Sequence, residues 1–172
     1  SNADPATAQS TVVTSSGAFE MVANKSGGPA VIGFPTAFSL VICSPDSNGG
    51  IRLTNAVMTD TLPTAAFFVD AEGVEGVDWT YTPAVAPEQG GTVVFTNIPT
   101  VDVGGCLPRQ VTLRYDSDPG GVQTNQLAVS GDPEDGSSSV LLTDSHDFTI
   151  IAPYPEGQIA KSSTSQIGRA HV

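Results

Sequence analysis

The sequence predicts an all-β domain, an Ig-like β-sandwich with Greek-key connections. Short runs rich in Val, Ile, Thr and aromatic residues recur about every ten residues, and each stops at Asn, Asp, Pro or Gly. No stretch has the apolar period of a convincing amphipathic helix. The 18 glycines and 13 prolines suit the turns, and a hydrophobic content of 39% suffices for one core.

Clear turn signals bound the first expected strands. Residues 11–14 form either a lead-in strand or part of a Ser- and Thr-rich linker. Residues 19–23 form a short strand that ends at an NKSGG run, and the mostly apolar strand 36–43 ends at SPDSNGG. Residues 51–59 form the next strand, which the DTLP turn at 60–63 stops.

The middle of the chain supplies three more strands. Residues 65–69, 79–83 and 93–96 are β-branched or aromatic runs, separated by acidic or Gly-rich loops at 70–78 and 87–91.

The C-terminal part contains the clearest alternation. Residues 111–115 alternate apolar and polar side chains, as a half-buried strand does. A turn at 116–121 joins this strand to 122–130 in a hairpin. Residues 140–143 and 148–151 form two final strands on either side of the polar DSHD run.

Composition limits the partners. Six Lys and Arg residues stand against 18 Asp and Glu residues, which gives a formal charge of -12. Six scattered cations cannot build a phosphate-binding face, so we expect no nucleic acid partner and no direct membrane insertion. With only 14% charged residues and many Thr, Ser and Gly, the chain is typical of secreted or cell-surface proteins.

Two cysteines, Cys43 and Cys106, allow one disulfide in an oxidising compartment. Two buried free thiols are the alternative.

Five short sequence motifs follow one another along the chain. They are Lys25-Ser26, LTNAVMTDTLP at 53–63, VVFTNIP at 93–99, VTLRYD at 111–116 and TNQLAVSG at 124–131. This order resembles the "conserved repeat domain" of bacterial surface proteins, domain of unknown function number eleven. The resemblance implies a non-catalytic structural or adhesive repeat, such as a stalk, spacer or adhesion domain. Its implied partners are neighbouring repeats of the same chain, with a surface polysaccharide or protein as a further candidate.

The expected domain organisation has three parts. Residues 1–16 combine SNA, which resembles a tag remnant, with a linker or lead-in strand; residues 17–155 form the sandwich repeat. Residues 156–172 are either a linker or the start of a following repeat, because 158–163 echo 21–26, although this echo could be chance. The tail 166–172 resembles a sequencing artefact.

Pilin-like surface sandwiches suggest one covalent possibility for a surface domain of this kind. In such domains a Lys on the first strand forms an amide with an Asn or Asp on a late strand, promoted by a buried acid. Lys25, Asn125 and Asp60 are the candidates here. Other interpretations are that Lys25 points into water before Ser-Gly-Gly, that Asn125 bridges a turn and that Asp60 caps one.

Acidic loops raise the possibility of calcium, although we expect no other cofactor or metal. Carboxylates gather at 116–118, 132–135 and 144–147, where hard cations find oxygen ligands. None of these runs has a recognised calcium-loop spacing, and acidic turns often only solvate the chain. The candidate ligands are Asp116, Asp118, Asp132 and Asp135.

A ligand-binding module for carbohydrate or another surface polymer is the second functional hypothesis. Phe67, Trp79 and Tyr81 could stack on sugars, or they could simply fill the core.

Catalysis is not expected. His146 is the only credible base and is interpreted as a solvated turn residue, and no serine lies in a strand-to-helix elbow. An enzyme would require His146 in a cleft beside a buried acid.

Overall fold

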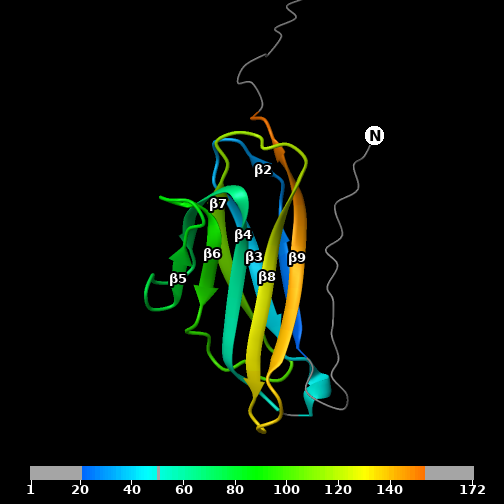
Figure 1. Cartoon of the computed structure of the whole chain (residues 1–172). Coiled ribbons are helices and arrows are strands. Elements are labelled where there is room, and N and C mark those ends of the chain that lie inside the picture. The colour runs from blue at the N-terminus through cyan, green and yellow to red at the C-terminus, as the bar shows by residue number, and fades with distance from the viewer. Residues whose placement is uncertain (1–20, 50, 154–172) are drawn as a thin grey trace, which may run out of the picture.

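The computed structural model describes residues 21–49 and 51–153, and it confirms the all-β prediction. These residues form nine strands and one 3-10 turn (Figure 1). The elements are β1 (Val22–Gly27), β2 (Ala30–Val31), β3 (Thr36–Cys43), η1 (Asp46–Asn48), β4 (Leu53–Ala71), β5 (Trp79–Thr82), β6 (Gln89–Phe95), β7 (Cys106–Arg114), β8 (Val122–Pro133) and β9 (Val140–Ile151).

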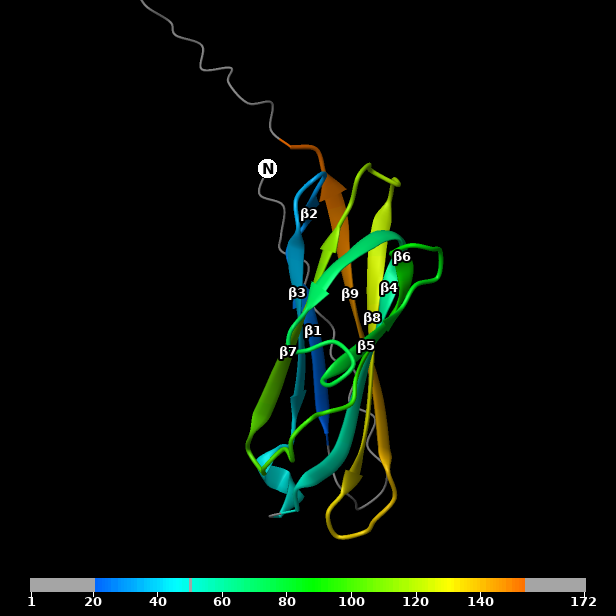
Figure 2. The same ribbon diagram turned by 90° about the vertical axis from the view of Figure 1, so that its left-hand side faces the viewer.

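The strands form the two layers of a sandwich, and β4 belongs to both (Figures 1 and 2). The hydrogen-bonded order is β1-β3-β7-β4-β8-β9-β2, while β6 pairs with β4 and β5 pairs with β6. The first half of β4 pairs with β8 and β6, and its second half, from Phe67 to Ala71, pairs with β7. A strand that changes layers at an irregularity makes a corner of the sandwich.

The expected stop at residues 60–63 is wrong. Leu62 and Pro63 are both buried in succession, and the register with β6 shifts between Leu62 and Phe67. Proline donates no ladder hydrogen bond, so the chain crosses between layers here without turning back.

The expected break between residues 140–143 and 148–151 is also wrong, because β9 runs continuously through 144–147. Alternate side chains of β9 point inward, and two of them, Asp144 and His146, are polar. The polar run was interpreted as a turn, although its period of two continues that of the apolar flanks. By contrast, the alternation predicted for 111–115 is confirmed, since Val111, Leu113 and Tyr115 are fully buried. The expected hairpin with 122–130 is wrong, because β7 pairs with β3 and β4 whereas β8 pairs with β4 and β9.

The predicted disulfide joins Cys43 and Cys106, which lie directly opposite one another on β3 and β7 with a Cα–Cα distance of 4.0 Å. It closes a loop with a sequence separation of 63. In the chain-entropy model such a link stabilises the fold by about 4 kcal/mol.

The described chain enters the sandwich at one end and leaves it at the other. Val22 at the start of β1 pairs with Cys43, beside the disulfide. Ile151 at the end of β9 pairs with Val31 of β2, which follows β1 at the far end of the sandwich (Figure 1). β1 and β9 are therefore the strands that connect the module to whatever flanks it.

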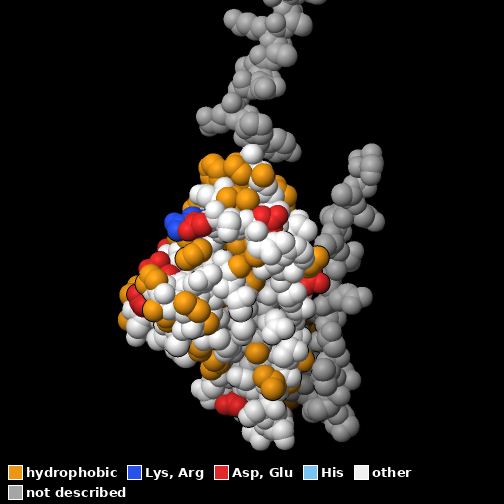
Figure 3. Space-filling model, turned by 45° about the horizontal axis from the view of Figure 1, so that its top comes forward, with side chains coloured by type: hydrophobic (Ala, Val, Ile, Leu, Met, Phe, Trp, Pro, Cys, Tyr) orange, Lys and Arg blue, Asp and Glu red, His pale blue; other side chains and the backbone are white. Residues whose placement is uncertain are grey.

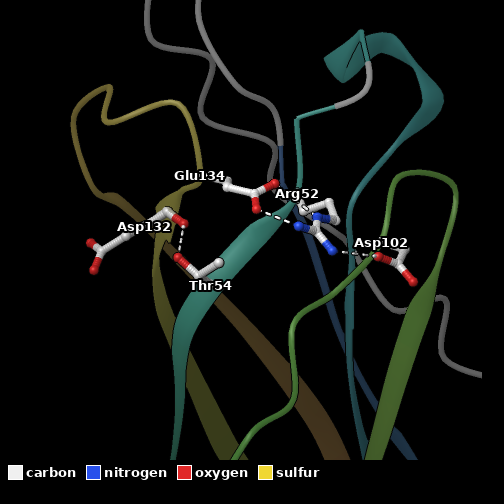
Figure 4. A network of polar contacts seen from close by, with 5 residues as sticks. All are labelled: Arg52, Thr54, Asp102, Asp132 and Glu134. Atoms are coloured by element: carbon white, nitrogen blue, oxygen red, sulfur yellow. Dashed lines mark hydrogen bonds and ion pairs between the residues drawn. The ribbon is translucent and has the colours of Figure 1, made fainter.

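A polar network ties the loops at the disulfide end (Figure 4). The Arg52 guanidinium donates two hydrogen bonds to Glu134, with its Nε 2.8 Å from Oε2, and lies 3.9 Å from Asp102. The Thr54 hydroxyl donates to the Asp132 carbonyl at 3.0 Å. The side chains of Arg52, Asp102 and Glu134 are exposed, so the contribution of their ion pairs to stability is small.

The opposite end, where β9 finishes, shows mainly apolar and uncharged side chains (Figure 3). Among the large hydrophobic residues there, Phe34, Val122 and Ile151 are exposed. No helix in the described part of the chain could span a membrane.

Candidate functional site: a buried lysine, aspartate and asparagine

The sandwich interior contains several polar side chains that a β-sandwich core ordinarily lacks. Lys25, Asp60 and Asn125 have no exposed surface, and Asp144 and His146 are nearly as buried. Lysine and aspartate are among the residues least often fully buried unless they are paired. We therefore take this cluster as the candidate site.

Strand periodicity turns Lys25 inward. Along β1, Ala23 and Lys25 are buried, whereas Asn24 between them and Ser26 after them are partly exposed. Successive side chains of a strand point to opposite faces, so Lys25 shares the inner face with Ala23. The expectation that Lys25 points into water is wrong, because this alternation outweighs the Gly-Gly turn signal that follows.

Register places Asp60 and Asn125 on the same inner face of the opposite layer. Asp60 on β4 pairs with Leu127 on β8, and Asn125 lies two residues before Leu127. Both residues are therefore in strand interiors, and neither caps nor bridges a turn. Across β9, Asp144 pairs with Leu127 and His146 pairs with Asn125.

Lys25 reaches across the core to Asp60. Its Nζ lies 2.5 Å from Asp60 Oδ1, and both side chains are inaccessible. The amide of Asn125 is near enough to lower the pKa of Asp60, yet neither its nitrogen nor its oxygen meets hydrogen-bond geometry. Asp60 Oδ2 also lacks a hydrogen-bond partner. Such unpaired buried groups cost about 1–3 kcal/mol each, so their presence needs an explanation.

Burial favours the neutral forms of both ionisable partners. Desolvation lowers the pKa of Lys25, although the nearby carboxylates of Asp60 and Asp144 oppose this. Desolvation also raises the pKa of Asp60, against the effects of Lys25 and Asn125. A neutral amine is a nucleophile and a protonated carboxyl is an acid, so the pair can exchange a proton during a reaction.

Aromatic rings shield the cluster from water. The ring centroid of Phe38 lies 6.0 Å from Lys25 Nζ and 4.7 Å from that of Phe148. His146 stacks on Phe148 with a centroid separation of 6.1 Å and is 7% exposed. The interpretation of His146 as a solvated turn residue is therefore wrong. His146 does not line the hollow of about 360 Å³ on the β4, β8 and β9 surface, whose lining residues are Thr61, Gln126, Leu127, Ala128, Thr143, Asp144 and Ser145.

Sequence reasoning named Lys25, Asp60 and Asn125 together but missed Asp144 as a member of the interior cluster. Asp144 Oδ2 accepts a hydrogen bond from the Lys25 backbone N–H at 2.7 Å, and its Oδ1 has no partner. The alternation of residues 142, 144, 146, 148 and 150 would have placed it inside.

The four candidate calcium ligands lie in two separate places, Asp116 and Asp118 in the loop before β8 and Asp132 and Asp135 at and just after its end. Each carboxylate already accepts hydrogen bonds from protein donors. No group of three or more potential metal-binding side chains exists among residues 21–49 and 51–153. The donors are Arg114 for Asp116, the Gly120 N–H for Asp118, Asn55 and Ser139 for Asp132, and the Ser137 N–H for Asp135.

The candidate stacking residues do not form an exposed platform. Trp79 is only 5% exposed and packs edge-on against Phe68 at 5.4 Å. Tyr81 stacks on Phe68 at 4.2 Å, and the Arg114 guanidinium lies 5.8 Å from the Phe67 ring centroid. These rings mainly pack against one another and the chain, as the core-packing alternative expects.

Comparison with solved structures supports the fold class. The cohesin module of a family 33 glycoside hydrolase from Clostridium perfringens ATCC13124 is similar with a TM-score of 0.51 and 14% identity, over 77% of this chain and 99% of that one. The full-length major pilin SpaD from Corynebacterium diphtheriae gives a TM-score of 0.53 and 13% identity, over 76% of this chain and 35% of the pilin. This chain thus corresponds to about a third of that pilin's length.

AvmM, which catalyses macrocyclization in alchivemycin A biosynthesis, is also similar, with a TM-score of 0.47 and 13% identity over 86% of this chain and 98% of that one. No protein-family model matches the chain, and no curated protein matches its sequence. The Ig-like β-sandwich class is therefore shown, whereas membership of the conserved repeat domain stays a prediction.

Proposed function

We propose that this chain is a structural module of a secreted or cell-surface bacterial protein, in which Lys25 and Asn125 become joined by an amide bond. The observation that carries the proposal is the inaccessible Lys25–Asp60 pair beside an Asn125 amide without hydrogen bonds. Apolar side chains at these positions would make the fold at least as stable, so stability alone does not account for the buried polar groups.

The reaction needs no reagent beyond the three side chains. The neutral Lys25 Nζ attacks Asn125 Cγ while protonated Asp60 donates a hydrogen bond to the amide oxygen. Asp60 then passes its proton to the departing Nδ2 and takes one from Nζ in exchange, so it ends protonated as it began. One C–N bond forms, one C–N bond breaks and ammonia leaves, so the atoms balance without an oxidant. The dry interior also keeps water from competing with the amine.

The location of the bond suits a structural role. Lys25 lies on the strand where the described chain enters, and Asn125 lies on the strand that precedes the exit strand β9. An amide here would carry tension across the sandwich without loading most of its hydrogen-bonded ladders. The disulfide supports an oxidising, extracellular location.

Peptide mapping tests the amide directly. Trypsin cleaves after unmodified Lys25, but it cannot cleave after a lysine whose amine is acylated. The reduced wild-type protein should be one ammonia lighter than calculated, and its digest should contain 1–52 joined to 115–161. Mapping is essential because an Asn-Gly step such as 48–49 can also lose ammonia by forming a succinimide.

Matched variants assign the roles. Lys25→Arg, Asn125→Ala and Asp60→Asn should each restore the full calculated mass. Gln126→Ala, which alters the exposed neighbour of Asn125, should still lose ammonia. A folded wild-type protein of full mass, cleaved after Lys25, would overturn the proposal. Loss of one water would instead mean that a carboxylate is the acceptor, which would overturn the assignment of Asn125.

A further inference from the structure

Besides the Lys25–Asp60 ion pair, a second carboxylate contact attaches the backbone of the first strand to the opposite layer, and pairing within sheets does not explain it. β1 lies at one end of the strand order and pairs with β3, where Lys25 is opposite Leu40. The Lys25 backbone N–H donates to Asp144 Oδ2 at 2.7 Å, across 119 residues of sequence. At the edge of a sheet, such an N–H would ordinarily lack a partner strand, and here Asp144 accepts its hydrogen bond instead.

Asp144 holds this position from within the site. It is 5% exposed, and it lies on the inner face two residues before His146, which pairs with Asn125. Fixing the Lys25 backbone to β9 therefore fixes it relative to the strand that carries Asn125. The second oxygen of Asp144 has no hydrogen-bond partner, so the carboxylate is held mainly by this contact.

We infer that Asp144 is a positioning residue for amide formation, holding the Lys25 backbone at the level of Asn125 so that the amine can reach Asn125 Cγ. This inference rests on the proposed amide. Positioning matters because misplacement of reacting groups by about 1 Å can slow a reaction about 100-fold.

Asp144 also makes the reaction depend on pH. Its charge raises the pKa of Lys25 and so opposes formation of the reactive neutral amine. Around Lys25, Asp60 on β4 contacts the amine directly, and the Phe38 ring on β3 lies 6.0 Å from it. His146 on β9 lies next to Phe38, with a centroid separation of 6.3 Å, and is paired with the uncharged Asn125 on β8. Removing the charge of Asp144 while keeping an acceptor oxygen should let the amine react at lower pH.

The experiment follows ammonia loss by mass spectrometry while the full-length protein refolds from denaturant at several pH values. Asp144→Ala should slow the loss about 10- to 100-fold. Asp144→Asn, which retains an acceptor oxygen, should react over a pH range displaced towards acid. Ser145→Ala, at the adjacent exposed position of β9, is the control and should match the wild type.

The outcomes separate the two proposals. A wild-type protein that never loses ammonia overturns the proposed amide and this inference together. A wild type that reacts, alongside a folded Asp144→Ala variant with the same rate, overturns only the role of Asp144. If Asp144→Ala does not fold, the Asp144→Asn profile decides, because an unchanged pH range contradicts the inference.

Discussion

At the scale of single residues, the charge state of Asp60 and its effect on stability depend on its partner Lys25. Without the lysine, an inaccessible carboxyl would lie in the core with no opposite charge. Desolvation already raises the pKa of Asp60, and loss of Lys25 removes the main effect that lowers it. Breaking a buried pair in this way costs about 3–5 kcal/mol, because the remaining charge stays uncompensated.

We therefore expect Lys25→Met to become less stable as pH rises. The folded pKa of Asp60 would exceed its unfolded value of about 4, so the protonated acid stabilises the fold fully only below that pH. As pH rises through the folded pKa, the free energy of unfolding should fall by about 3 kcal/mol. Urea unfolding followed by the fluorescence of the buried Trp79 measures this.

The double variant Lys25→Met/Asp60→Asn is the control, since it has no carboxyl at this position to titrate. Its free energy of unfolding should stay nearly level over the same pH range. Equal pH dependence in the single and double variants would show that Asp60 is not the group responsible.

The sequence identified the three residues of the candidate site but not their surroundings. Lys25, Asp60 and Asn125 were named from a resemblance, and turn signals beside them favoured solvent-exposed or capping roles. Their burial comes from contacts between residues far apart in the sequence, 35 residues for Lys25 with Asp60 and 119 for Lys25 with Asp144, which local patterns cannot show. Asp144 was grouped with acidic loop residues because a charge within a polar run resembles a turn.

At the scale of elements, long strands account for the main differences from the predicted pattern. β4 has 19 residues because Pro63 marks a passage between layers, whereas proline ordinarily indicates the end of a strand. β9 has 12 residues because the polar run at 144–147 continues the strand, with Asp144 and His146 pointing into the interior cluster. In both cases the tertiary environment outweighs the local signal.

The end of β1 offers a test of packing beside the site. Gly27 lies directly opposite Phe38, and an added Cβ would come within 2.3 Å of Phe38 Cδ1. Phe38 is fully buried next to Lys25, so the ring cannot move freely. Gly27→Ala should lower the free energy of unfolding by about 1–3 kcal/mol through overpacking.

The adjacent glycine provides a matched control. A Cβ at Gly28 would meet nothing within 4 Å, so Gly28→Ala should change the free energy of unfolding by less than about 0.5 kcal/mol. Chemical denaturation of the two variants compares them directly. Similar losses in both would mean that the loss at Gly27 does not arise from contact with Phe38.

At the scale of the whole molecule, the disulfide and the proposed amide would together limit how far the module can extend. If Lys25 and Asn125 are joined, tension between the ends of the described chain bypasses most of the sandwich. Only residues 126–153 and the few before Lys25 can then unravel. The Cys43–Cys106 loop lies within the bypassed segment.

Pulling single molecules by their termini should therefore resolve three lengths. Unfolding of the wild type should add about 10 nm of contour, set by the 28 residues after Asn125. Lys25→Met should add about 25 nm with the disulfide intact, and about 45 nm after reduction. A wild type that extends as far as Lys25→Met would contradict the amide.

The disulfide at one end of the sandwich also keeps the chain covalently connected after proteolytic cleavage within its loop. The exposed loops at 72–77 and 83–88, which a protease can reach, both lie between Cys43 and Cys106. Cleavage there leaves the two fragments covalently attached, and a Lys25–Asn125 amide would attach them a second time. A nicked molecule would thus still link whatever precedes it to whatever follows it, so damage to these loops need not sever the chain.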